Sequence, residues 1–178
     1  MSKPIGLPTI LVEPNQPFGA KIAMRHDEVD QDMRNLAFDF FYWFSRFEFA
    51  LKEKRFLKSE VIGTRADPSW DKFVKAHRAG YVASSAAEAL LAEKPQRQIV
   101  GDPEYTFEEL SFSQNTADLD KVVAYAKTVR NNLFHGGKHG HNQWDDPARM
   151  RRLLRLTITV LVELAVVGDF GGDYDRYY

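Results

Sequence analysis

The chain has 178 residues and a hydrophobic fraction of 44%, which suffices for one well-buried core and is short for two. It contains no cysteine, so disulfides, thiol catalysis and cysteine-based zinc sites are excluded. The formal net charge of −1 argues against general adhesion to nucleic acid through a basic surface. Because the N-terminus also lacks a basic segment followed by an apolar run, we expect a cytoplasmic protein.

The N-terminal region differs in composition from the rest of the chain. Residues 1–26 hold four of the eight prolines and show little helical periodicity. We expect this segment to form an extended or partly disordered arm. Residues 27–168 are predicted to form a single helical domain. Residues 169–178, which include two adjacent glycines, are expected to form a flexible tail.

The first predicted helix runs from about residue 28 to 57 and is rich in aromatic residues. One face carries Leu36, Phe40, Trp43, Phe47 and Leu51, and other sides carry Phe38, Phe41 and Phe49. A helix that is apolar on several sides must be covered on several sides, so we expect core packing on one side and a subunit interface on the other. Charges at Asp39, Arg46 and Glu48 interrupt the apolar run, so no membrane span is expected.

The middle of the chain carries two shorter helices and a long loop. Ser69 is expected to cap the first of these helices, which reaches Ala79. Ser84 or Ser85 is expected to cap the second, which reaches about Glu93. Residues 95–114 are expected to form a loop with a short strand pair, near Ile99–Val100 and Tyr105–Phe107. A loop of this length is a candidate functional segment.

The sequence predicts both ends of the last helix. Asp146 is expected to cap it, with Pro147 at its first position and Gly168 at its end. Its inner stripe consists of Met150, Leu153, Leu154, Thr157, Leu161 and Leu164. With the other predicted helices, this pattern favours an all-α fold.

Another helix, capped by Thr116 or Asp118, is expected to end in the run Arg130-Asn131-Asn132-Leu133-Phe134-His135-Gly136-Gly137. Its apolar stripe is Leu119, Val122, Val123, Ala126, Val129 and Leu133, and Arg130 projects within this stripe. A guanidinium group keeps its charge, so near a core it needs carboxylates, carbonyls or a phosphate around it. Arg130 is therefore either a structural residue paired with an internal acid or an anion-binding residue.

His135 adds a second chemical group at the end of this helix. A histidine that titrates near neutrality can pass protons to and from a reacting group, although it can also serve only as a helix cap. Asn131 precedes it by one turn, where its amide could orient the ring or contact a ligand. Five residues turn a helix by about 140°. Arg130 and His135 would therefore share a pocket only if the helix frays before His135, or if two copies meet across a symmetry axis.

The run from Arg130 to His135 resembles the Arg-x(4–6)-His motif of the HEPN superfamily, helical domains found in many prokaryotic toxins and defence proteins. The aromatic stretch over residues 41–52 is similar to the first long helix of one HEPN group. The resemblance implies a bundle of about four to five helices, with long antiparallel first, motif and last helices. It also implies a metal-independent endoribonuclease, active as a homodimer with the paired motifs at the interface.

The resemblance also implies roles for individual residues. Arg130 would bind the phosphate and His135 would transfer the proton, with Asn131 and Glu48 in support. No metal or cofactor is needed, because the ribose hydroxyl of RNA is the nucleophile. Gly137 stands where some family members carry a tyrosine that a partner nucleotidyltransferase modifies, so that regulation is not expected here. An antitoxin protein would be a further partner.

A ribonuclease with this net charge must concentrate positive charge locally. The candidate RNA backbone contacts after the motif are Lys138, Arg149 and Arg152. The other interpretation of these arginines is a solvated helix face, with Asp145 paired to Arg149. A metal site built from His135, His139, His141 and Asp145 or Asp146 does not match a familiar zinc spacing, so no metal is expected.

Two further functional interpretations stay open. A non-catalytic HEPN-like dimer would bind a nucleotide or a protein partner through the same cleft. A scaffold protein with a purely structural Arg130 would do neither.

Overall fold

The computed structural model describes residues 29–102, 105–135 and 146–175. Within these ranges the chain forms six helices and one two-stranded antiparallel sheet, so the predicted all-α class is confirmed. The arm expected over residues 1–26 lies outside the described residues, as do Lys138, His139, His141 and Asp145. No helix within the described ranges combines the length and the apolar character that crossing a bilayer requires.

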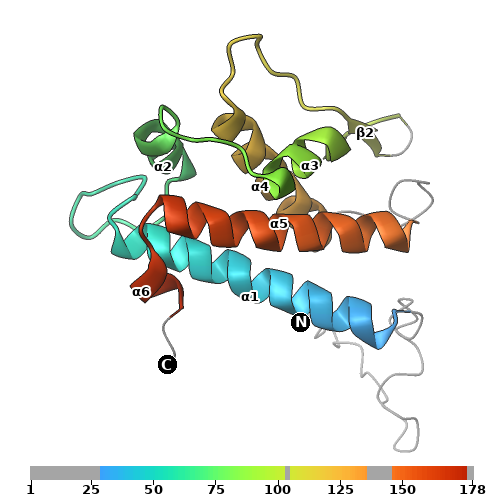
Figure 1. Cartoon of the computed structure of the whole chain (residues 1–178), viewed down its shortest axis with the longest axis horizontal. Helices are drawn as coiled ribbons and strands as arrows, with labels where there is room; N and C mark the ends of the chain where they lie inside the picture. Colours follow the sequence, from blue (N-terminus) through green and yellow to red (C-terminus); the bar gives the residue numbers. More distant parts are fainter. Residues whose placement is uncertain (1–28, 103–104, 136–145, 176–178) are drawn as a thin grey trace, which may run out of the picture.

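The first and last long helices, α1 (Gln31–Glu53) and α5 (Pro147–Val167), pack along one another (Figure 1). They run parallel: Arg151 near the start of α5 pairs with Asp30 at the start of α1, and Lys54 and Asp169 pair beyond the other ends. In an alternating antiparallel arrangement of the first, motif and last helices, the first and last run parallel to one another, so this direction does not contradict the prediction. Three helices lie between them in the chain, and the last of these returns the chain to the end where α1 begins.

That returning helix is α4 (Asp118–His135). The Phe41 ring contacts Phe134, while Phe44 lies against Arg130, so contacts that advance along α1 recede along α4. The motif helix is therefore antiparallel to the first helix, as predicted.

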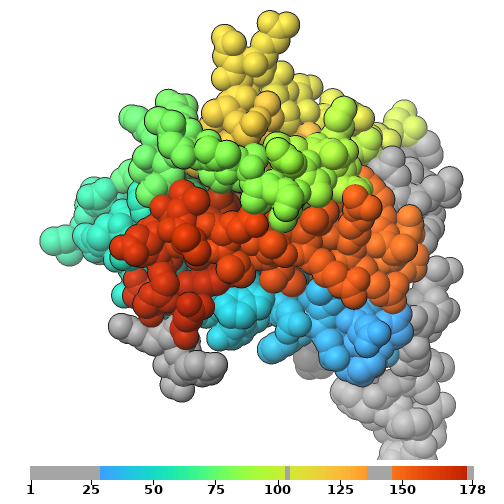
Figure 2. All heavy atoms as spheres, viewed as in Figure 1, coloured from blue at the N-terminus to red at the C-terminus, as the bar shows by residue number. Residues whose placement is uncertain are grey.

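The shorter helices pack around this frame. The helix α2 (Trp70–His77) contacts α4, and α3 (Ser85–Glu93) contacts both α4 and α5. Figure 2 shows α5 across the middle of one face of the molecule, between α3 and α1. The predicted caps are confirmed for three helices: Ser69 for α2, Ser84 for α3 and Asp146 for α5.

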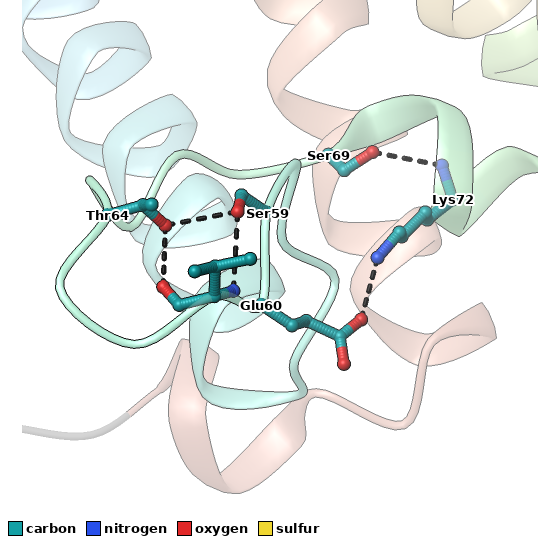
Figure 3. A network of polar contacts seen from close by, with 6 residues as sticks. Ser59, Glu60, Thr64, Ser69 and Lys72 are labelled. Carbon is teal, nitrogen blue, oxygen red and sulfur yellow. Dashed lines mark hydrogen bonds and ion pairs between the residues drawn. The ribbon is translucent and has the colours of Figure 1, made fainter.

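The loop between α1 and α2 is held by a polar network (Figure 3). Thr64 Oγ1 donates to the Val61 carbonyl at 2.7 Å and lies 3.1 Å from Ser59 Oγ. The Lys72 ammonium donates to Glu60 at 2.7 Å and so ties this loop to the first turns of α2. The charge of Lys72 is thus used within the fold.

Aromatic rings fill the core at one end of α1. The Phe47 ring stacks on Trp70 at 4.7 Å between centroids, and it lies 5.5 Å from Phe73 and 5.3 Å from Phe170. Such contacts stabilise a core beyond the area they bury. The inner stripe predicted for α5 is confirmed, because all six of its residues are buried.

The segment that follows α5 corrects a boundary. Phe170 and Tyr174 are buried, and a short helix, α6 (Gly171–Tyr174), carries the second of them. Arg46 is buried in α1 and donates to the carbonyls of Asp173 and Tyr174. A Cβ at Gly168 would lie 2.6 Å from the Phe170 ring, so this close approach requires glycine. Residues 170–175 therefore belong to the packed domain, and the tail predicted from residue 169 starts too early.

The long segment before α4 contains the predicted strand pair. The strands β1 (Arg97–Ile99) and β2 (Thr106–Glu108) pair with Gln98 opposite Phe107. The side-chain amide of Asn132 on α4 donates to the Gln96 carbonyl at 2.7 Å. This bond fastens the base of the strand pair to the motif helix. In Figure 2 the yellow segment between β2 and α4 projects from the top of the molecule.

Candidate functional site

The motif helix stays helical through His135, which removes one of the two alternatives, fraying before the histidine, and leaves the meeting of two copies. Its buried side includes Val122, Ala126 and Val129, and its opposite side is exposed around Asn131. On a regular helix, Arg130 lies about 100° to one side of Asn131 and His135 about 40° to the other side. The two candidate catalytic side chains therefore border one exposed face without pointing in the same direction.

Arg130 is half-buried between two aromatic rings. Its guanidinium carbon lies 5.9 Å from the centroid of the Phe44 ring and 5.4 Å from that of the Phe134 ring. In the part of the chain that the structure describes, no carboxylate forms an ion pair with Arg130. If Arg130 were a purely structural residue, an internal acid would pair with it. No such acid is found among these residues. The ring faces attract the cation and leave its charge unneutralised.

Asn131 contacts the arginine and not the histidine. Its Oδ1 atom accepts a hydrogen bond from Arg130 Nη1 at 3.0 Å. The amide thereby fixes one edge of the guanidinium group. The predicted alternative, in which Asn131 orients the imidazole, does not occur in this structure.

His135 is exposed, and its side chain makes no hydrogen bond or ion pair with any other residue that the structure describes. Its ring is accessible to a ligand approaching the exposed face of α4. Gly136 and Gly137, which follow it in the motif, lie outside the described residues.

Glu48, the supporting residue expected from α1, takes part in core packing. Its carboxylate accepts a hydrogen bond from the indole Nε1 of Trp70 at 3.1 Å. Trp70 in turn contacts Phe44, the ring beneath Arg130. Glu48 is thus connected to Arg130 through two aromatic side chains and makes no hydrogen bond to it in the described structure.

The two arginines predicted as RNA contacts converge on one acid at the end of α3. Arg152 Nε lies 2.7 Å from Glu93 Oε1, and Arg149 Nε lies 3.7 Å from Glu93 Oε2. Arg149 also donates to the Glu93 carbonyl oxygen at 2.9 Å. An RNA phosphate would have to compete with Glu93 for both guanidinium groups. These contacts agree with a role in joining α5 to α3.

Large aromatic side chains are exposed on α1 and at the end of α4. We call Phe38, Phe41, Tyr42 and Phe134 the aromatic patch. Phe41 is 49% exposed and Phe134 is 45% exposed, although their rings touch at 5.8 Å between centroids. Contiguous apolar surface next to polar groups is typical of interaction sites. The aromatic patch is therefore the side of the first helix on which we expect the predicted subunit contact.

A groove between α2 and α4 was not predicted from the sequence. It has a volume of about 260 Å³ and is lined by Asp71, Val74, Lys75, Arg78, Asp120, Val123, Ala124 and Lys127. The signal in the sequence was the spacing of Asp120, Ala124, Lys127 and Asn131, which follow one another at intervals of three or four residues along α4. Which helix lies opposite this row is decided by tertiary packing alone.

Comparison of the chain with protein-family models, with curated protein sequences and with solved structures gave no match. The HEPN resemblance therefore stays a prediction from the motif.

Proposed function

We propose that the chain is a metal-independent endoribonuclease of the HEPN type, in which Arg130 binds the scissile phosphate and His135 transfers a proton. The observation that supports this most strongly is the environment of Arg130. Its charge is held by aromatic rings and by one amide, with no acid beside it in the described part of the chain. An exposed histidine borders the same face of α4.

The contacts of Arg130 leave most of its hydrogen-bonding capacity for a ligand. A guanidinium group has five N–H donors, and one of its nitrogens is used by Asn131. The remaining donors suit two phosphate oxygens, which arginine binds in a bidentate manner. Contacts with two rings restrict the orientations of the group, so less entropy is lost when a phosphate binds.

The divergence of Arg130 and His135 favours a dimer. In one continuous helix the two side chains point about 140° apart, so a second copy is needed to bring an arginine and a histidine to one phosphate from opposite sides. The aromatic patch adjoins Arg130 and offers an apolar surface for this contact. The net charge of −1 presents little electrostatic barrier to association of two copies.

The proposed reaction uses the 2′-hydroxyl of the RNA as nucleophile. One His135 imidazole removes the 2′ proton, the 2′ oxygen forms a bond to phosphorus, and the bond from phosphorus to the 5′ oxygen breaks. The imidazolium that forms then gives this proton to the departing 5′ oxygen. Arg130 stabilises the negative charge that builds on the phosphate during attack. The products are a 2′,3′-cyclic phosphate and a 5′-hydroxyl end.

An activity of this kind suits a cytoplasmic toxin or defence protein that an antitoxin protein keeps inactive. The second candidate function is a non-catalytic dimer that binds a nucleotide or a protein through the same face. It is favoured by one observation, the absence of any hydrogen bond that positions the His135 ring within the described structure.

The test is RNA cleavage in excess chelator by the wild type and by Arg130→Ala and His135→Ala. A positioned proton-transfer group contributes about a hundredfold to ten-thousandfold, so His135→Ala should lose activity by that factor. Arg130→Ala should lose on the order of a hundredfold to a thousandfold. The matched control is Arg155→Ala, because Arg155 is exposed on the outer side of α5.

Both variants should unfold at nearly the wild-type temperature, and the wild-type product should carry the cyclic phosphate end. Unchanged cleavage by His135→Ala would exclude the proton-transfer role. A thermal shift with RNA and no cleavage by the wild type would favour the binding protein.

A further inference from the structure

The groove between α2 and α4 contains three cations that form no ion pair with the described residues. Lys75 and Arg78 come from the end of α2, and Lys127 comes from α4. None of these side chains forms an ion pair with another residue in the described ranges. Lys72, on the same helix, differs because its ammonium group is paired with Glu60 (Figure 3). The cations of the groove are therefore available to an anionic ligand.

An acid in the groove makes the site more selective than a plain basic patch. Asp120 Oδ2 is buried and has no hydrogen-bond partner among the described residues. A buried carboxylate oxygen without a donor is costly, and such atoms are nearly always satisfied. With Asp71 also in the lining, the groove carries three cations and two carboxylates. A ligand that fits this set must offer both negative charge and a hydrogen-bond donor.

The groove and the motif residues lie on the same helix, α4. Along α4, Lys127 precedes Asn131 by four residues and Arg130 by three, so it lies about 4.5 Å along the helix axis from Arg130. Asp120 lies about 15 Å from Arg130 along the same axis. An extended strand of a few nucleotides would span this distance. A ligand in the groove and a phosphate at Arg130 can thus belong to one chain.

We propose that this groove binds the sugar–phosphate backbone of single-stranded RNA a few nucleotides away from the scissile link. Lys75, Arg78 and Lys127 contact phosphates, and Asp120 accepts a hydrogen bond from a ribose 2′-hydroxyl. That hydroxyl is the group by which a protein distinguishes RNA from DNA. The proposal rests on the ribonuclease function given above and adds where the substrate lies before it is cut.

Binding and cleavage are measured separately, so that the two proposals can fail separately. Binding uses the full chain carrying His135→Ala and a fluorescent single-stranded RNA of twelve nucleotides, titrated at several salt concentrations. For single strands, the slope of log K against log salt changes by about 0.7 for each phosphate contact. Lys75→Gln combined with Lys127→Gln should therefore reduce the slope by about 1.4 and weaken binding.

Lys72→Gln is the matched control, because it removes the same charge from α2 outside the groove lining. It should leave the salt slope unchanged. An equal loss of slope in Lys72→Gln and in the double variant would overturn the proposal, since it would reveal only a general charge effect. A wild-type slope in the double variant, or no RNA binding at all, would also overturn it.

The contact of Asp120 is tested with single-stranded DNA of the same sequence. The chain should prefer RNA, and Asp120→Ala should reduce this preference while changing the salt slope little. Equal binding of RNA and DNA would overturn the assignment of Asp120.

Cleavage of a dinucleotide, whose only phosphate is the scissile one, separates the groove from the catalytic motif. The double variant should cut the dinucleotide as the wild type does and should show a raised KM for the twelve-nucleotide RNA. Groove-dependent RNA binding by a wild type that cuts neither substrate would support the groove and refute the nuclease. Cleavage by the wild type, together with an unchanged KM in the double variant, would support the nuclease and refute the groove.

Discussion

Arg130 on α4 and the arginines at the start of α5 offer a direct comparison. Arg149 and Arg152 share the carboxylate of Glu93, and Arg151 pairs with Asp30, so their charges are used to join helices. Arg130 lies between the Phe44 and Phe134 rings, and no acid neutralises it within the described structure. The number of arginines in a segment therefore says little about anion binding. What matters is whether the fold supplies a carboxylate.

The strongest test of the comparison mixes two inactive proteins. If each site takes Arg130 from one copy and His135 from the other, a dimer of an Arg130→Ala chain with a His135→Ala chain contains one intact site. Random mixing should then restore about a quarter of the wild-type cleavage rate, although each variant alone has lost at least about a hundredfold.

The measurement is cleavage after the two variants are unfolded and refolded together, with separately refolded samples as the control. Mixtures as inactive as their components would show that Arg130 and His135 do not act across a dimer interface.

The Phe44 and Phe134 rings that contact Arg130 should contribute to cleavage. Phe134→Leu keeps the side chain apolar and removes the ring that lies 5.4 Å from the guanidinium carbon. A cation–π contact contributes about 0.5–2 kcal/mol, which corresponds to roughly a twofold to thirtyfold loss in kcat/KM. Phe112→Leu removes a ring that packs on Tyr125 away from Arg130 and serves as control. A loss of the same size in both variants would contradict a specific role for the Phe134 ring.

The arginines of α5 should behave in the opposite way. Glu93→Gln removes the acid that Arg149 and Arg152 share and should lower the free energy of unfolding by about 1 kcal/mol. Arg152→Ala should change RNA cleavage less than about threefold, far below the loss expected for Arg130→Ala. Denaturant unfolding and cleavage assays measure the two effects. Glu88→Gln, an exposed change on α3, is the control for stability. A hundredfold loss of cleavage in Arg152→Ala would remove the distinction between the two groups of arginines.

The smallest expected effect concerns Asp30. Its pKa is lowered from 3.8 because its carboxylate accepts the Met33 N–H and then because it pairs with Arg151. A carboxyl group with a lowered folded-state pKa stabilises the fold above its unfolded pKa, and this contribution is lost as the pH falls through the folded value. Asp30→Asn should therefore lower the unfolding temperature slightly at pH 7 and less at pH 3. A difference that grows on acidification would contradict the sign.

Features set by residues close together in the sequence could be predicted, and features set by distant residues could not. The caps Ser69, Ser84 and Asp146, the strand pair and the buried stripe of α5 were predicted correctly. Each depends on residues within a few positions of one another. The motif helix was also located correctly, but whether it frays before His135 was left open. The groove at Lys75, Arg78 and Lys127 was missed because its two walls are far apart in the sequence.

The sequence by itself determined the helical class, the starts of the helices and the presence of an arginine at the edge of an apolar stripe. Only the tertiary structure decided that α1 and α5 run parallel, that Phe170 and Tyr174 pack into the core, and that Glu93 takes up the charge of two arginines. The reason is physical. Caps and periodicity are contained in one or two helical turns, whereas the partner of a charge or a ring is set by the path of the whole chain.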